Sequence, residues 1–183
     1  FKQSIEKYRK NINNIEEIKV VDELLYRIDN DVDFFIRKKI SGKVDIAASV
    51  LLLSDDLERG LFLFHKKIKE WTMPGGHADG EFDLYKVALE ELKEEVNISL
   101  KKDKRGIPSL IYKYDYSEDV FGYKKSIINV FYIEICPKDQ EAKLMEPDKC
   151  EEIKWMKLID VEKMAKEKNS ESIQKLIDLW KKI

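Results

Sequence analysis

Three glutamates, Glu91, Glu94 and Glu95, are spaced so that one helix would bring their carboxylates together. The segment Asp83 to Val96 contains no Gly or Pro and consists largely of good helix formers, which predicts a helix of about three to four turns. Residues three and four apart are neighbours on a helix, where like charges repel. Magnesium prefers oxygen ligands and would remove this repulsion, so the spacing indicates a divalent-metal site.

The three glutamates could form a metal site or only a solvated acidic surface, and the residues before the helix favour the metal site. A chain with 38% charged residues also displays glutamate-rich helix faces by chance. Here, however, Pro74, Gly75 and Gly76 directly follow a short apolar run. Pro and Gly stop a strand, and Gly permits backbone conformations closed to other residues, which predicts a structured loop. Asp79 or Asp83 would cap the helix that follows.

Together, loop and helix resemble the Nudix box, a glycine loop followed by a helix with the pattern Glu-x-x-Glu-Glu. The resemblance places the first box glycine at Gly76, the closing apolar residue at Ile98, and the metal-binding residues at Glu91, Glu94 and Glu95. It extends from about residue 45 to residue 164, because the segment 146–151 ahead of Trp155 is similar to a late segment of Nudix nucleotide hydrolases.

Three positions depart from the Nudix box. Phe82 replaces a glutamate and Glu90 replaces an arginine, two residues that pair in the family and steady the loop against the helix. Because both partners have changed together, no charge is left without its partner, which is the cheaper way to lose an ion pair. Asn97 replaces the terminal glycine, and Asn is the other residue that tolerates the left-handed conformation after a helix.

The resemblance implies an α/β fold, an α/β/α sandwich with a mixed sheet, and an enzyme that hydrolyses phosphorus-containing acid anhydrides. Mg²⁺, with Mn²⁺ as a substitute, would bind Glu91, Glu94 and Glu95 together with a carbonyl of Gly75 or Gly76. The metal would polarise a diphosphate and lower the pKa of the attacking water. Glu94 or Glu95 could instead act as the general base. The substrate would be a small nucleotide such as a nucleoside triphosphate or ADP-ribose.

Five further residues are candidates for substrate binding, and each also has a structural reading. His77 could reach a phosphate or base, or only organise the loop. Trp71 could stack on a nucleobase or pack in the core. Lys66 could contact phosphate or belong to a solvated turn, and Glu151 or Glu152 could supply a further carboxylate from a later loop or lie in solvent.

The remaining pattern predicts a sandwich that follows an N-terminal extension. Residues 1–40 show helical spacing, and residues 41–183 form the predicted Nudix domain. Within it, 45–54 and 61–65 are predicted to be paired strands, and 109–116, 126–135 and 153–158 are further strands. A charged loop spans 138–152, and a helix ends the chain, capped by Asn169 or Ser170.

The overall composition of the chain limits the classes of partner that it is expected to bind. The 34 basic and 36 acidic residues nearly cancel, so no nucleic-acid polymer and no membrane surface is expected to bind through long-range charge. Two cysteines without metal-ligand spacing suit a reducing cytoplasm. The apolar face of the N-terminal helices could form a homodimer contact.

Two alternatives to hydrolysis stay open, a nucleotide-sensing module with weakened turnover and an interaction protein built on a Nudix scaffold.

Overall fold

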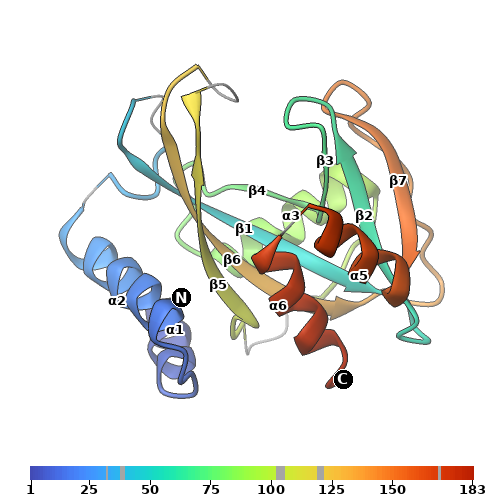
Figure 1. Ribbon diagram of the computed structural model, residues 1–183, viewed down its shortest axis with the longest axis horizontal. Helices are drawn as coiled ribbons and strands as arrows, with labels where there is room; N and C mark the ends of the chain where they lie inside the picture. The colour runs from blue at the N-terminus through green and yellow to red at the C-terminus, as the bar shows by residue number, and fades with distance from the viewer. Residues whose placement is uncertain (32, 38–39, 102–105, 119–121, 169) are drawn as a thin grey trace.

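The computed structural model describes residues 1–183 except 32, 38–39, 102–105, 119–121 and 169, and its strands form one mixed sheet with helices on both faces (Figure 1). The strands are β1 (Val44–Leu53), β2 (Arg59–His65), β3 (Glu70–Thr72), β4 (Gly75–His77), β5 (Leu110–Tyr116), β6 (Lys125–Ile135) and β7 (Cys150–Lys157). The helices are α1 (Lys2–Arg9), α2 (Ile15–Asn30), α3 (Leu84–Val96), α5 (Leu158–Glu167) and α6 (Glu171–Trp180).

β1 is the central strand of the sheet. It runs parallel to β6 from Val44 to Leu53 and antiparallel to β4, and it meets β2 at a single pair, Leu53 with Gly60. The longer partner of β2 is β7, and β3 and β5 lie at the two ends of the main strand order. The predicted pairing of the first two strands is therefore confirmed but short, and the sheet is mixed as expected.

Each face of the sheet has its own apolar core. Ile46, Ala48 and Val50 of β1 join the apolar side of α3 in one core, while Leu51 and Leu53 join α5 and α6 in the other. Successive strand residues point to opposite faces, so the largely apolar β1 supplies both cores. The α/β/α sandwich predicted from the sequence is confirmed.

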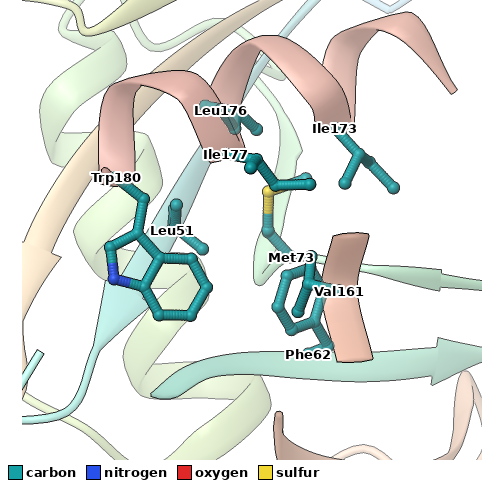
Figure 2. A pocket seen from close by; sticks show the side chains of 8 residues that line it. All are labelled: Leu51, Phe62, Met73, Val161, Ile173, Leu176, Ile177 and Trp180. Atoms are coloured by element: carbon teal, nitrogen blue, oxygen red, sulfur yellow. The ribbon is translucent and has the colours of Figure 1, made fainter. Parts of the chain in front are cut away.

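The core beneath α6 leaves a small apolar cavity (Figure 2). Side chains from the sheet and from the two C-terminal helices point toward it, and all are apolar: Leu51, Phe62, Met73, Val161, Ile173, Leu176, Ile177 and Trp180. Trp180 also fixes the end of α6, because its indole Nε1 donates to the Leu57 carbonyl at 2.8 Å. The cavity offers no polar partner and belongs to the packing of α6 on the sheet.

The N-terminal helices belong to the core on the α3 side. Ile5, Val21 and Leu24 are completely buried there, and Lys113 of β5 pairs with Glu23 of α2 at 2.9 Å. The apolar face that the sequence offered to a homodimer contact is thus covered within the chain. The oligomeric state and the boundary at residues 40 and 41 stay predictions.

Several sequence-based boundaries need correction. β7 begins at Cys150, so Glu151 and Glu152 lie in a strand and not in the charged loop. Two helices follow β7 where one was expected, because α5 begins at Leu158 directly after the strand. Ser170 is the N-cap of α6 without a capping side-chain hydrogen bond, and Asn169 lies outside the described residues. None of the helices in the described part of the chain is both long and apolar enough to cross a bilayer.

Candidate active site

α3 forms as its sequence predicts. Asp83 is the N-cap, and its carboxylate accepts a hydrogen bond from the backbone N–H of Lys86 at 3.2 Å. Asp79, the other candidate cap, instead lies in the preceding turn and pairs with Arg37 at 3.3 Å. The helix ends at Asn97, whose φ of 59° is left-handed as expected for the residue in the glycine position. The helix is thereby fixed at both ends beside the sheet.

Gly75 and Gly76 form the short strand β4, which corrects the expected loop. β4 pairs with β1, so that Gly76 lies opposite Ala48 and Gly75 opposite Ser49. Neither glycine has a positive φ. Glycine is required here for space: a Cβ on Gly76 would lie 1.8 Å from Glu91 Oε1, and one on Gly75 would lie 2.2 Å from Ser49 Oγ. The sequence suggests conformational freedom as the reason for these glycines, but the structure shows that they are needed because a side chain would not fit.

Two of the three box glutamates pack against β4. The Glu91 carboxylate occupies the space where a side chain of residue 76 would be. Glu95 is 6% exposed, and its Oε2 accepts a hydrogen bond from the Gly75 N–H at 2.9 Å. Burial raises the pKa of Glu91 and raises that of Glu95 to about 8. Glu94, by contrast, is exposed on the same helix.

Glu146 joins this acidic group, although the sequence pointed to later glutamates. The segment before it is fastened to α3, since the Met145 N–H donates to the Glu95 carbonyl at 2.9 Å. The Glu146 carboxylate helps to raise the pKa of both Glu91 and Glu95, after the larger effect of burial. Lys149 Nζ lies 2.8 Å from Glu146 Oε2, so one ammonium faces this group of carboxylates. The sequence signal was the similarity of the segment 146–151 to Nudix nucleotide hydrolases.

The donor chemistry of this group suits a hard divalent cation. Buried carboxylates that raise one another's pKa lack enough positive charge around them, and oxygen-rich anionic sites are what Mg²⁺ and Mn²⁺ bind. As arranged here, no three His, Cys, Asp or Glu side chains of the described residues already surround a common ion position. The exposed side chain of Glu94 would have to turn toward Glu91 and Glu95 to complete the set.

His77 lies in a separate buried cluster at the start of β1 and β6. Lys125 Nζ lies 2.9 Å from His77 Nε2 and 3.0 Å from Asp45 Oδ2, and Asp45 and Lys125 are 3% and 5% exposed. Burial and the charge of Lys125 lower the pKa of His77 to about 4. A neutral imidazole therefore accepts a hydrogen bond from the ammonium. This geometry favours the organising reading of His77 over phosphate contact.

Lys66 lies in the turn after β2, and Trp71 lies on β3. Lys66 ties β2 to the turn before β7, because its backbone N–H donates to the Lys149 carbonyl at 2.9 Å and its ammonium donates to the Pro147 carbonyl. Trp71 is half-buried on β3, and its ring meets Phe64 edge-on with centroids 5.4 Å apart. Lys66 thus holds the turn before β7 in place. Trp71 is packed against the core but remains partly accessible to solvent.

Glu151 and Glu152 are not brought to the acidic group. Both are exposed on β7, and Glu151 pairs weakly with Lys69, with 3.8 Å between Nζ and Oε1. The carboxylate from a later segment is supplied by Glu146 instead. The sequence alone could not show which of Glu146, Glu151 and Glu152 lies near Glu91 and Glu95, because this depends on where β7 begins and how it pairs with β2.

The two changed box positions have new partners. Phe82 packs against Phe35 with ring centroids 4.7 Å apart, which connects the box to the N-terminal extension. Lys86 lies 2.5 Å from Glu81 and 3.6 Å from Glu90. Glu81 and Lys86 thus form an ion pair at the surface between the loop and the helix.

Comparison with known proteins places this site in a family. A family model described as the NUDIX domain matches residues 43–177. The chain belongs to the Nudix family, and the prediction of a Nudix hydrolase, an enzyme acting on phosphorus-containing acid anhydrides, is confirmed. A search of curated proteins gave no match.

Among solved structures, the C. elegans Ap4A hydrolase binary complex is 23% identical with a TM-score of 0.52, and the match covers 75% of this chain and 95% of that one. The MutT protein from Methanosarcina mazei is 17% identical with a TM-score of 0.50, over 79% and 95% of the two chains. The E. coli dihydroneopterin triphosphate pyrophosphohydrolase is 16% identical with a TM-score of 0.50, over 74% and 98%. At these identities the likeness concerns the fold.

Proposed function

We propose that the chain hydrolyses a diphosphate linkage in a small nucleoside diphosphate-linked substrate and requires Mg²⁺ or Mn²⁺. The observation that carries the proposal is the placement of Glu91 and Glu95 against the two glycines of β4, with Glu146 beside them. Such a group of carboxylates has little structural use, because burying like charges together costs stability. Binding of a cation and a phosphorylated substrate would account for this group of carboxylates.

Glu91, Glu94 and Glu95 would hold the cation, joined by a backbone carbonyl of Gly75 or Gly76. The cation would place positive charge beside the diphosphate oxygens and favour ionisation of the attacking water. The Gly75 N–H fixes the orientation of the Glu95 carboxylate, and the turn at Glu146 is fixed by its bond to α3.

The substrate itself is tested by turnover. Release of phosphate or nucleoside monophosphate should be measured for nucleoside triphosphates, dinucleoside polyphosphates, nucleotide sugars and ADP-ribose, with Mg²⁺ or Mn²⁺. Metal-dependent turnover by the wild type should fall by about two orders of magnitude or more in Glu94→Gln and Glu95→Gln, since each loses part of the charge that holds the metal. Glu152→Gln, an exposed change on β7, is the matched control and should retain turnover.

A nucleotide-sensing module is the alternative that the box departures favour. Measurable nucleotide binding without turnover in the wild type would establish it in place of the hydrolase. The Glu81–Lys86 pair speaks against it, because the loop is still tied to the helix. The cytoplasmic setting, the lack of nucleic-acid and membrane partners, and the homodimer stay predictions.

A further inference from the structure

The loop between β4 and α3 connects the two elements that form the candidate metal site. It spans residues 78–82, with Gly76 on one side and the helix of Glu91 on the other. Its middle residues have left-handed backbone conformations, with φ of 45° at Asp79 and 99° at Gly80. A residue other than glycine rarely adopts such a conformation, which persists where the surrounding structure holds it in place. The loop therefore needs contacts that fix it.

The N-terminal extension provides three such contacts, all from one short segment that follows α2. The Gly80 N–H donates to the Phe35 carbonyl at 2.8 Å. Phe82 lies against the ring of Phe35, with ring centroids 4.7 Å apart. Arg37 Nε lies 3.3 Å from Asp79 Oδ1. The extension thus contacts the loop along most of its length.

The segment that makes these contacts is itself fixed in the core. Phe34 and Phe35 are both buried, and Phe35 also meets Phe1 edge-on with ring centroids 6.0 Å apart. The Phe34 N–H donates to the Asp31 carbonyl at 3.0 Å. Phe82, by contrast, is 63% exposed. Its contact with Phe35 therefore joins the loop to a fixed point without placing Phe82 in the core.

The loop lies close enough to the metal site to affect it. Burial is the main cause of the raised pKa of Glu91, and the negative charge of Asp79 adds to it. The Glu91 carboxylate occupies the space beside Gly76, two residues before the loop begins. A shift of the loop would therefore change both the charge near Glu91 and the place where its carboxylate lies.

We propose that the N-terminal extension is a positioning part of the metal site, in which Phe35 holds the loop through Gly80 and Phe82 and thereby sets the position of Glu91. The extension lies outside residues 43–177, which match the family model, yet it is needed for full metal affinity and turnover. The inference rests on the proposed function for the metal and the reaction only, because the contacts between extension and loop form within the protein.

The test is the variant Phe82→Ala, which removes the ring contact from the loop and takes little from the core. We expect the affinity for Mn²⁺, measured by calorimetry without substrate, to fall about tenfold, as for other partners that orient metal ligands. The Gly80 amide, which donates to Phe35, should exchange its hydrogen faster in the metal-free protein. The thermal unfolding temperature should change little, because Phe82 is mostly exposed.

Two further variants distinguish positioning from a general loss of structure. Phe82→Tyr keeps the ring and should retain the affinity and the exchange rate of the wild type. Tyr26→Ala is the matched control, because it removes from α2 an aromatic ring that is 68% exposed.

Three results would overturn the positioning role. They are an unchanged Mn²⁺ affinity in Phe82→Ala, a loss of affinity shared by Tyr26→Ala, and an unchanged exchange rate of the Gly80 amide in Phe82→Ala. An absence of hydrolysis by the wild type would instead count against the proposed function, since both measurements are made without substrate.

Discussion

Two buried charged clusters lie on either side of the β4 glycines, and they are balanced differently. In the Asp45 cluster, one carboxylate meets the ammonium of Lys125, and His77 beside them is neutral. In the acidic group, Glu91 and Glu95 of α3 lie with Glu146, and among the described residues the ammonium of Lys149 is the one that lowers the pKa of both Glu91 and Glu95. The first cluster is complete within the protein, while the second has an excess of negative charge.

This difference in charge balance distinguishes a cluster with a structural role from one with a chemical role. A buried ion pair with compensated charge fixes strands in place and needs no ligand. Buried carboxylates with raised pKa values need a cation from outside and are typical of functional sites. His77 follows the box glycines in sequence yet belongs to the balanced cluster, so position in a motif does not by itself indicate a role in binding.

The largest effect is expected in the balanced cluster. Lys125→Met would leave the Asp45 carboxylate buried without its ammonium and should lower the free energy of unfolding by about 3–5 kcal/mol. Urea denaturation measures this loss. The control is the double variant Asp45→Asn with Lys125→Met, which removes both charges and should recover much of the stability. A single variant as stable as the wild type would show that the cluster is not compensated as described.

In the unbalanced cluster, Gly76→Ala should reduce activity more than stability. The new Cβ would meet the end of the flexible Glu91 side chain, which can move aside at the expense of metal binding. We expect kcat/KM to fall about a hundredfold, as for loss of a metal ligand, with a small change in Tm.

Gly75→Ala is the contrasting variant, because its Cβ would meet the backbone carbonyl of Ala48 at 2.5 Å and should destabilise the sheet. Thermal unfolding and Mn²⁺ titration of both variants separate the two cases. Equal stability losses in the two would contradict the assignment.

The pH dependence of stability should also reveal the unbalanced cluster. The pKa of Glu95 is raised from about 4.5 to about 8 in the folded protein, so between these values the folded state holds a proton that the unfolded state has lost. Stability of the metal-free protein should therefore fall as pH rises through this window.

Glu95→Gln, which cannot lose a proton, should lack this component, with a difference on the order of a few kcal/mol between pH 5 and pH 8.5. Denaturation at a series of pH values measures it. Parallel curves for wild type and variant would rule out a raised pKa at Glu95.

The smallest effect is expected at the surface pair that ties the loop to α3. Lys86 is exposed, and exposed ion pairs contribute little, so Lys86→Met should change kcat/KM by less than about twofold. Lys93→Met, on the same helix and also exposed, is the control. A loss far above that of the control would mean that the Glu81–Lys86 pair has the full positioning role of the missing Glu–Arg pair.

Local rules made the sequence informative about α3 and most strands. Of the two candidate caps, Asp79 and Asp83, the structure selects Asp83, and the left-handed helix end expected at Asn97 is confirmed. The strands β1, β5 and β6 lie within a residue of their predicted ranges, because β-branched and apolar runs identify buried strands. α5 was missed since its start directly after β7 carries no turn signal.

By itself, the sequence determined the family, the helix and the spacing of Glu91, Glu94 and Glu95, because these depend on residues close together in the chain. Only the tertiary structure decided which distant residues join them. Strand pairing brought Gly75 against Ser49, and the bond from Met145 to α3 placed Glu146, and not Glu151, beside the acids. Register and long-range hydrogen bonds set these contacts, and a one-residue slip would send each side chain to the opposite face.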